Sequence, residues 1–329
     1  MRRAPLIAAF LLLSALFPAY ASSQEVPAAP PAPPETAAPA GMELALEGTY
    51  RTGRDRIAFV GSRLRLRGLV GQFAEGQVAE ITIKRGRKVV KEGRETVASP
   101  DGASGEFAID YRTRKRGMLT VAVKVLGPDG QPGKASAPLR IAVVRPRARR
   151  GSRGPFVRFV RARLAAMHYA VSGGSRFSDA TARAVLAYRK VNGMSRTRGV
   201  NRNIAVHLAE GKGAFRPRHG GGKHVEADIS RQVLALIGGN GDVERVYHMS
   251  SGKSSTPTVL GTFHFYMKQP GTNGKRMVHS SYFIRGYAIH GFNPVPTSPA
   301  SHGCIRVPIP NALSIFRWIH NGDAIHVYR

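Results

Sequence analysis

A single cysteine, Cys304, lies near the end of this 329-residue chain, shortly after two histidines, His290 and His302. A thiol attacks a carbonyl carbon as its thiolate, and a neighbouring imidazole can accept the thiol proton. A solitary cysteine with nearby histidines is the pattern expected of a catalytic nucleophile. We therefore interpret Cys304 as a nucleophile. The alternative is a buried structural cysteine that packs as a small hydrophobic residue.

The residues around Cys304 predict how it is positioned. Two short apolar runs, Tyr282–Ile284 and Tyr287–Ile289, predict strands, so His290 would end a strand. Residues 292–300 contain three prolines, which favours a shaped loop over a helix. Gly303 lets the backbone approach a bound carbonyl closely, and the amides around Gly303 and Cys304 are candidate donors to an oxyanion.

His290-Gly291 followed by Ser301-His302-Gly303-Cys304-Ile305-Arg306 resembles the L,D-transpeptidase catalytic domain, also called the YkuD domain. The resemblance covers about the last third of the chain. It implies a mostly-β catalytic domain over residues 222–329, with Cys304 as nucleophile and His290 as general base. It also implies that the Gly291 carbonyl orients the base and that His302 shapes the site.

Four residues are candidates for substrate binding: Arg306, Ser301, Gly291 and Tyr282. Two roles stay open for Arg306, since a fixed cation can hold a substrate carboxylate or brace the Cys304 turn. Tyr282 is placed over the substrate groove by its position before the strand that carries His290. We expect no metal and no cofactor.

The resemblance implies an enzyme that crosslinks peptidoglycan stem peptides through a thioester, with carbapenem β-lactams as inhibitors. An L,D-carboxypeptidase, in which water accepts the acyl group, is the first alternative. A non-catalytic wall-binding protein is the second. A metallopeptidase is disfavoured because the chain has no His-Glu-x-x-His motif and no second cysteine.

The N-terminal residues predict export to the periplasm or the extracellular cell wall. Residues 1–21 have the charged start, apolar core and small-residue cleavage site of a signal peptide. Residues 22–41 form a Pro/Ala-rich linker, a composition that cannot bury a core.

The predicted fold is multidomain. Residues 42–146 alternate apolar and polar positions between turn signals, which predicts a β-sandwich of immunoglobulin-like type. Residues 147–153 read as a basic linker. Residues 154–215 predict three short helices that resemble the peptidoglycan-binding type 1 domain. A purely structural spacer is the alternative for this helical module.

The chain carries 50 basic and 20 acidic residues, a formal net charge of +30. Such a charge is typical of nucleic-acid binding. Because an exported protein meets little nucleic acid, we do not expect that partner. Anionic cell-wall polymers or a membrane surface would attract the chain by the same electrostatics.

Overall fold

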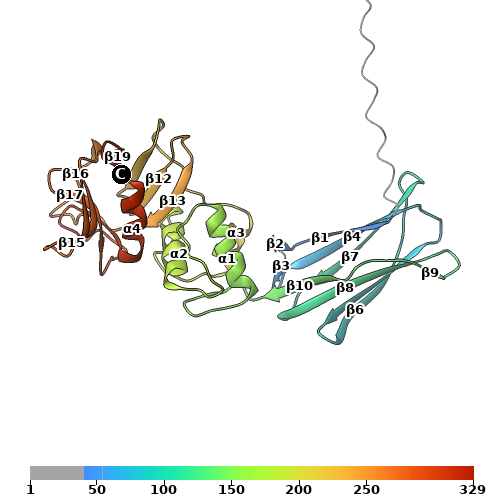
Figure 1. Cartoon of the computed structure of the whole chain (residues 1–329). Helices are drawn as coiled ribbons and strands as arrows, with labels where there is room; N and C mark the ends of the chain where they lie inside the picture. The colour runs from blue at the N-terminus through green and yellow to red at the C-terminus, as the bar shows by residue number, and fades with distance from the viewer. Residues whose placement is uncertain (1–40, 54) are drawn as a thin grey trace, which may run out of the picture. The chain divides into compact units, whose positions relative to one another are not determined.

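The computed structural model describes residues 41–53 and 55–329. The predicted signal peptide and all but the last residue of the Pro/Ala-rich linker lie outside the described residues. Figure 1 shows the three parts that follow along the chain: β-sheets, three helices and a second group of β-sheets. Across the described part of the chain, no helix combines the length and apolar character needed to span a membrane.

The first part is built from two sheets that share one core. In β4, Arg63–Gly71, arginines face solvent while Leu64 and Leu66 are buried, as the period-two pattern predicts. The core takes side chains from both sheets, including Leu66 and Ile109 from one and Ile81 and Val121 from the other. One sheet has the order β1-β4-β7 and the other the order β2-β3-β10-β8-β5-β6, with β9 beside β8. The strands are β1 Met42–Glu47, β2 Tyr50–Thr52, β3 Asp55–Phe59, β5 Val78–Arg85, β6 Lys88–Thr96, β7 Ser104–Arg112, β8 Gly117–Leu126, β9 Pro132–Ala135 and β10 Leu139–Val144.

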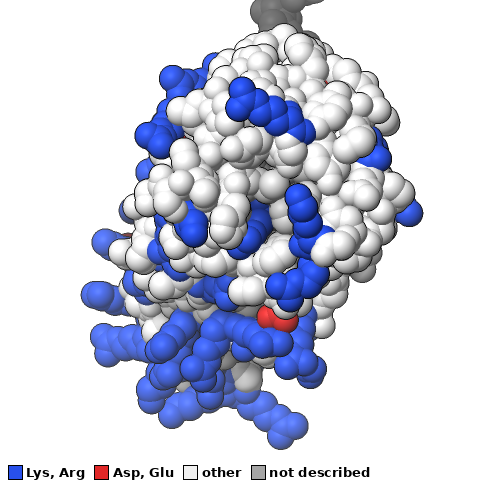
Figure 2. Space-filling model, turned by 90° about the vertical axis from the view of Figure 1, so that its left-hand side faces the viewer, with Lys and Arg blue, Asp and Glu red and all other residues white. Residues whose placement is uncertain are grey.

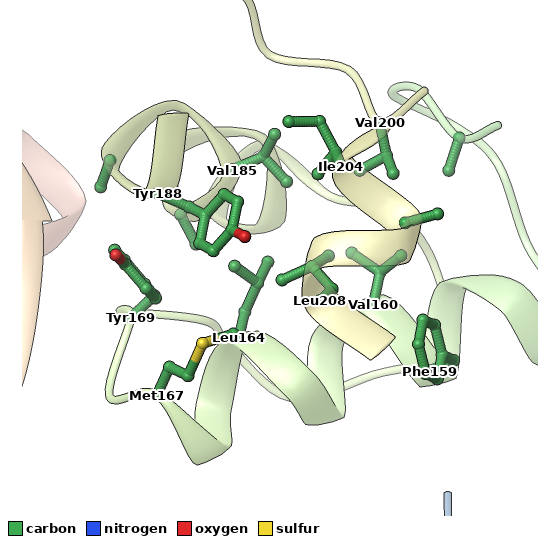
Figure 3. Close-up of a cluster of buried hydrophobic side chains, with 14 of the residues drawn as sticks. Phe159, Val160, Leu164, Met167, Tyr169, Val185, Tyr188, Val200, Ile204 and Leu208 are labelled. Atoms are coloured by element: carbon green, nitrogen blue, oxygen red, sulfur yellow. The ribbon is translucent and has the colours of Figure 1, made fainter. Parts of the chain in front are cut away.

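The helical module has the three helices that the sequence predicts: α1 Pro155–Ala166, α2 Asp179–Val191 and α3 Arg202–Ala209. The Ser178 side chain accepts from the Thr181 amide and so caps α2, and Asn201 caps α3 in the same way. Apolar side chains of the three helices point toward one another in Figure 3 and form a core that continues onto β3, β12 and β13. They include Leu164, Tyr188 and Leu208.

The segment 147–153, predicted as a basic linker, is attached to this module. Ala148 is buried and exchanges two backbone hydrogen bonds with Val200, of 3.0 and 2.8 Å. Arg153 forms an isolated bridge with Arg176. The predicted basic linker is therefore anchored to the module: the small Ala148 enters the module's core while the arginines around it stay at the surface.

The C-terminal part contains two further sheets and a helix around one core. The five-stranded sheet has the order β13-β12-β11-β19-β14 and the four-stranded sheet the order β15-β16-β17-β18. Helix α4, Ile309–Trp318, contacts β16, β17 and β18 and buries Ala312 and Ile315 between the sheets. The strands are β11 His224–Asp228, β12 Val233–Ile237, β13 Val243–His248, β14 Gly261–His264, β15 Met267–Thr272, β16 Val278–Ile284, β17 Tyr287–Phe292, β18 Ile305–Pro308 and β19 Ala324–Tyr328.

A buried lysine joins the helical module to this C-terminal part. Lys190, near the end of α2, places its Nζ 2.9 Å from the Met249 carbonyl oxygen and 3.1 Å from that of Gln232. The same Nζ lies 2.8 Å from Nδ1 of His248, on β13. Because a buried polar group without partners is costly, these three contacts fix α2 against β12 and β13.

This junction should weaken in acid. Burial and the charges of Lys190, Arg198 and Arg183 together lower the pKa of His248 to about 3, against the opposing contact with the Val295 carbonyl. Since the unfolded imidazole titrates near 6.5, the unfolded chain binds more protons between pH 6.5 and 3, and stability falls as the pH falls. We expect a loss of about 2 kcal/mol between pH 6.5 and 5, at ~1.4 kcal/mol per pH unit. Urea unfolding of the protein and of His248→Gln, which lacks this titration, measures the difference. Equal pH slopes for the two would contradict the expectation.

Candidate active site

Cys304 and His290 are brought together by two parallel strands. In the pairing of β17 with β18, Ile289 lies opposite Ile305 and His290 lies opposite Arg306. Both isoleucines are buried in the core. Because successive side chains alternate between the faces of a sheet, His290, Arg306 and Cys304 share the opposite face.

The loop between β17 and β18 is held by backbone hydrogen bonds to the segment after β13. The amides of Ala300 and Ser301 both donate to the Ser251 carbonyl, at 2.8 and 2.9 Å. The Ser251 hydroxyl and amide are bound by the Gln232 side chain, at 2.6 and 2.9 Å. Thr258 Oγ1 donates to the Gly303 carbonyl at 2.7 Å. The turn before Cys304 is therefore anchored to the connection between β13 and β14, two strands of the other sheet.

Ser301 shapes the turn from inside. Its buried hydroxyl donates to the Cys304 carbonyl at 2.5 Å and accepts from the Gly303 amide at 3.1 Å. These contacts favour a structural role over the predicted contact of Ser301 with substrate. They also correct the predicted oxyanion site, because the Gly303 amide is already engaged. Of the two amides predicted to donate to an oxyanion, the one that remains a candidate is that of Cys304.

Gly303 cannot be replaced without moving its neighbours. Its φ is +115°, and a Cβ there would lie 2.0 Å from the Tyr287 ring. We expect Gly303→Ala to lower the free energy of unfolding by at least ~1–3 kcal/mol through overpacking, and to slow reaction at Cys304. Gly239→Ala is the matched control, because a Cβ at Gly239 meets nothing within 4 Å. Denaturant unfolding of both variants tests this, and equal losses would contradict it.

His290 is buried and has a fixed orientation. Its Nδ1 lies 3.0 Å from the Gly291 carbonyl oxygen, and its ring packs edge-on against Phe292 with centroids 5.8 Å apart. With Nδ1 donating to that carbonyl, Nε2 is left as the basic nitrogen. Burial lowers the pKa of His290, the Gly291 contact opposes this shift, and Arg306 adds to it. The imidazole is therefore neutral, as a general base must be.

The Cys304 thiol is partly accessible, and its Sγ lies 3.7 Å from the Gly286 carbonyl oxygen. Burial raises the pKa of this thiol, while the Ala288 amide and the charges of Arg306 and Lys275 act in the opposite direction. At rest the site thus holds a neutral thiol and a neutral imidazole, both lining one cavity. Deprotonation of the thiol has to accompany its attack.

Both residues line a cavity of about 600 Å³. It also contains four other predicted site residues: Ser301, His302, Arg306 and Tyr282. Arg306 stacks on the Phe292 ring at 4.2 Å and donates to the Ala300 carbonyl at 3.4 Å, so it braces the loop while facing the cavity. Tyr282 donates from its hydroxyl to Gln269 Oε1 at 3.0 Å.

Gly291 contributes its carbonyl and its small size rather than a contact with substrate. A Cβ there would lie 2.7 Å from Ala312 Cβ in α4. The requirement for glycine is therefore steric, and it keeps β17 close to the helix.

Sequence reasoning missed the part of the cavity wall contributed by the turn after β15. Asn273, Gly274, Lys275 and Met277 line the cavity from there. The Asn-Gly pair is a turn signal that could have located this connection, but nothing in it shows that the turn faces Cys304. Within residues 41–53 and 55–329, no three His, Cys, Asp or Glu side chains are grouped as a metal site.

The part of the chain that carries this site is similar to known proteins. Residues 222–327 match the family described as YkuD, L,D-transpeptidase catalytic domain. A crystal structure of an L,D-transpeptidase from Xylanimonas cellulosilytica is 31% identical, covers 56% of this chain and 98% of its own, and has a TM-score of 0.52. An L,D-transpeptidase from Stackebrandtia nassauensis is 17% identical over 55% of this chain and 95% of its own, with a TM-score of 0.35. No curated protein matches the chain.

Proposed function

Because the chain belongs to the L,D-transpeptidase family with the YkuD catalytic domain, we propose that it is an exported enzyme that crosslinks peptidoglycan stem peptides. The observation that carries the proposal is the placement of Cys304 and His290 on one face of β17 and β18, in one cavity. His290 is held by the Gly291 carbonyl, and the Cys304 turn is held by Ser301.

In the proposed reaction, Cys304 Sγ attacks the carbonyl of the third stem residue, a diamino acid linked to a terminal D-alanine. His290 Nε2 accepts the thiol proton and passes it to the amine of the departing D-alanine. An amine of a second stem then attacks the thioester, and the thiol is restored. Splitting the transfer into two steps is the advantage of covalent catalysis. In this proposal Arg306, which lines the same cavity, attracts a substrate carboxylate to it.

The alternative of an L,D-carboxypeptidase differs only in the acceptor. Mass spectrometry of the protein mixed with a disaccharide-tetrapeptide tests both at once. We expect an acyl adduct on the peptide that contains Cys304, and a crosslinked dimer when an acceptor stem is present. Trimmed peptide without dimer would establish the carboxypeptidase. A protein that never forms the adduct would overturn both.

A β-lactam ring offers a strained carbonyl to the same thiolate, so a carbapenem is a second probe of the site. Since the chain has a single cysteine, we expect one drug mass per chain, located at Cys304. Labelling by a general thiol reagent, with no labelling by a carbapenem, would show a reactive thiol that lacks an oxyanion site.

The positive charge supports a second proposal, that the chain associates with anionic wall polymers. On the face in Figure 2, lysines and arginines are spread widely and acidic groups are scarce. Exposed charges are screened beyond ~8–10 Å near physiological ionic strength. We therefore expect binding to isolated cell walls to weaken steadily as salt rises, in a pelleting assay. Salt-insensitive binding would instead indicate a specific glycan pocket in the helical module.

A further inference from the structure

A second cavity, of about 380 Å³, lies where the helical module meets the catalytic domain. One wall comes from the module: Ala182 and Arg183 in α2, and Arg198 in the loop that follows α2. The other wall comes from the catalytic domain and includes Phe292 and the first residues of α4. Phe292 also lines the cavity that contains Cys304. The two cavities are therefore neighbours across one aromatic ring.

The charge of this cavity is unbalanced. Arg183 is half-buried and donates from Nε to Asn311 Oδ1 at 3.2 Å, a neutral partner. Arg198 is exposed at the rim. The one acidic residue of the lining, Asp179, is bound by Arg150 at 2.8 Å. Two guanidinium groups thus face the same space with one carboxylate, which already has a cationic partner.

Further observations support an anionic ligand. Burial lowers the pKa of Arg183, Asp179 opposes this shift, and Arg198 adds to it, which places the two guanidinium groups within electrostatic range of each other. The first turn of α4 contains Pro310 and has no side-chain cap, so its free amides add positive potential. Phe292, Val295 and Ile309 make part of the remaining wall apolar, and His248 and Asn293 are its polar members.

The cavity is also rigid. Lys190 fixes α2 to β12 and β13 by its three buried contacts. His248, which lines the cavity, has its Nε2 3.3 Å from the Val295 carbonyl oxygen and so ties the second wall to the same strand. A ligand would meet guanidinium groups that are already positioned, which reduces the entropy lost on binding.

We propose that this cavity is a subsite that binds a carboxylate of a peptidoglycan stem peptide whose reacting part reaches Cys304 past Phe292. Guanidinium groups suit this role because they bind carboxylates by paired hydrogen bonds. The inference rests on the proposed function for the identity of the peptide. Stem peptides carry several carboxylates, so either the acyl donor or the acceptor amine could be the bound partner.

The first measurement is binding, and it needs no turnover. A disaccharide-tetrapeptide and its fully amidated counterpart are titrated calorimetrically into Cys304→Ser protein, with and without Arg183→Gln and Arg198→Gln together. We expect Cys304→Ser protein that keeps both arginines to bind the carboxylate form about 10- to 100-fold more tightly than the amidated form. A hydrogen bond between charged groups contributes to affinity on that scale. The double replacement should remove most of this preference. Arg317→Gln, an exposed arginine of α4 outside the lining, is the matched control.

The second measurement separates donor from acceptor in protein that keeps Cys304. A slower acylation by the tetrapeptide in the double variant assigns the subsite to the donor, and a slower transfer from a preformed thioester to an acceptor stem assigns it to the acceptor. Acylation by a small carbapenem should not change in either case. If the double variant keeps the full preference for the carboxylate form, the inference is overturned. If that preference is lost but no Cys304 adduct ever forms, the subsite stands and the proposed function fails.

Discussion

Replacing Cys304 with serine is expected to abolish acyl transfer, with a loss on the order of 10⁴-fold or more. A hydroxyl at neutral pH is a much weaker nucleophile than a thiol, and His290, whose pKa is lowered by burial, is too weak a base to compensate. The fold should be unaffected, because the hydrogen bond that Sγ donates is long, 3.7 Å to the Gly286 carbonyl oxygen. Adduct formation with tetrapeptide or carbapenem, followed by intact mass, measures the loss.

The control for this prediction is thermal unfolding of the same serine variant, which should match the parent within about 2 °C because a near-isosteric change at one partly accessible atom removes little packing. A folded serine variant that still forms crosslinks at the parent rate would show that Cys304 is not the nucleophile.

Much of the fold could be predicted because the sequence patterns are local. The runs Tyr282–Ile284 and Tyr287–Ile289 lie in β16 and β17 as predicted, and Leu64 and Leu66 face the core as the alternation in β4 requires. The strands that were missed lack such a signal. In β15, Met267–Thr272, the sequence includes Pro270 and Gly271, and nearly every residue is exposed. Its pairing with β16 comes from tertiary contact, which a short polar run does not reveal.

The immunoglobulin-like character of the first domain stays a prediction. Its larger sheet contains one parallel pair, β3 with β10, among antiparallel ones. Strand periodicity predicts that two sheets share a core, but it does not determine the order in which the strands lie beside one another.

The candidate site also has a part that a single stretch of sequence predicts and a part that only tertiary packing brings together. Residues on the His290 to Arg306 stretch are found together because a single crossover between parallel strands joins them. Lys275 and Met277 approach from another hairpin, and Arg183 approaches the neighbouring cavity from the helical module. Only the three-dimensional packing brings these segments together. The engagement of the Gly303 amide by Ser301 is likewise invisible in sequence, since it depends on the turn geometry.

The two histidines of the site should differ sharply in mutants. His290→Ala is expected to slow acylation by ~10²–10⁴-fold, the usual cost of losing a general base, and His302→Ala should cost less. The reason is positional: His290 is buried with Nδ1 bound by the Gly291 carbonyl, whereas His302 is exposed at the cavity wall. Single-turnover acylation by a carbapenem, followed by the loss of its absorbance, compares the two variants with the parent.

The pH dependence of the same reaction separates a general base from a residue that only supports the fold. The lowered pKa of His290 keeps its imidazole unprotonated below the ordinary range, so the parent rate should fall only at pH values below about 6.5. His302→Ala should keep this profile. Without His290, the rate should follow the thiolate population and rise about tenfold per pH unit through neutrality, because burial raises the pKa of Cys304. If His290→Ala retained the parent profile and His302→Ala showed this steep rise, the proton acceptor would be His302. The Gly291 contact would then serve only to position β17 beside the cavity.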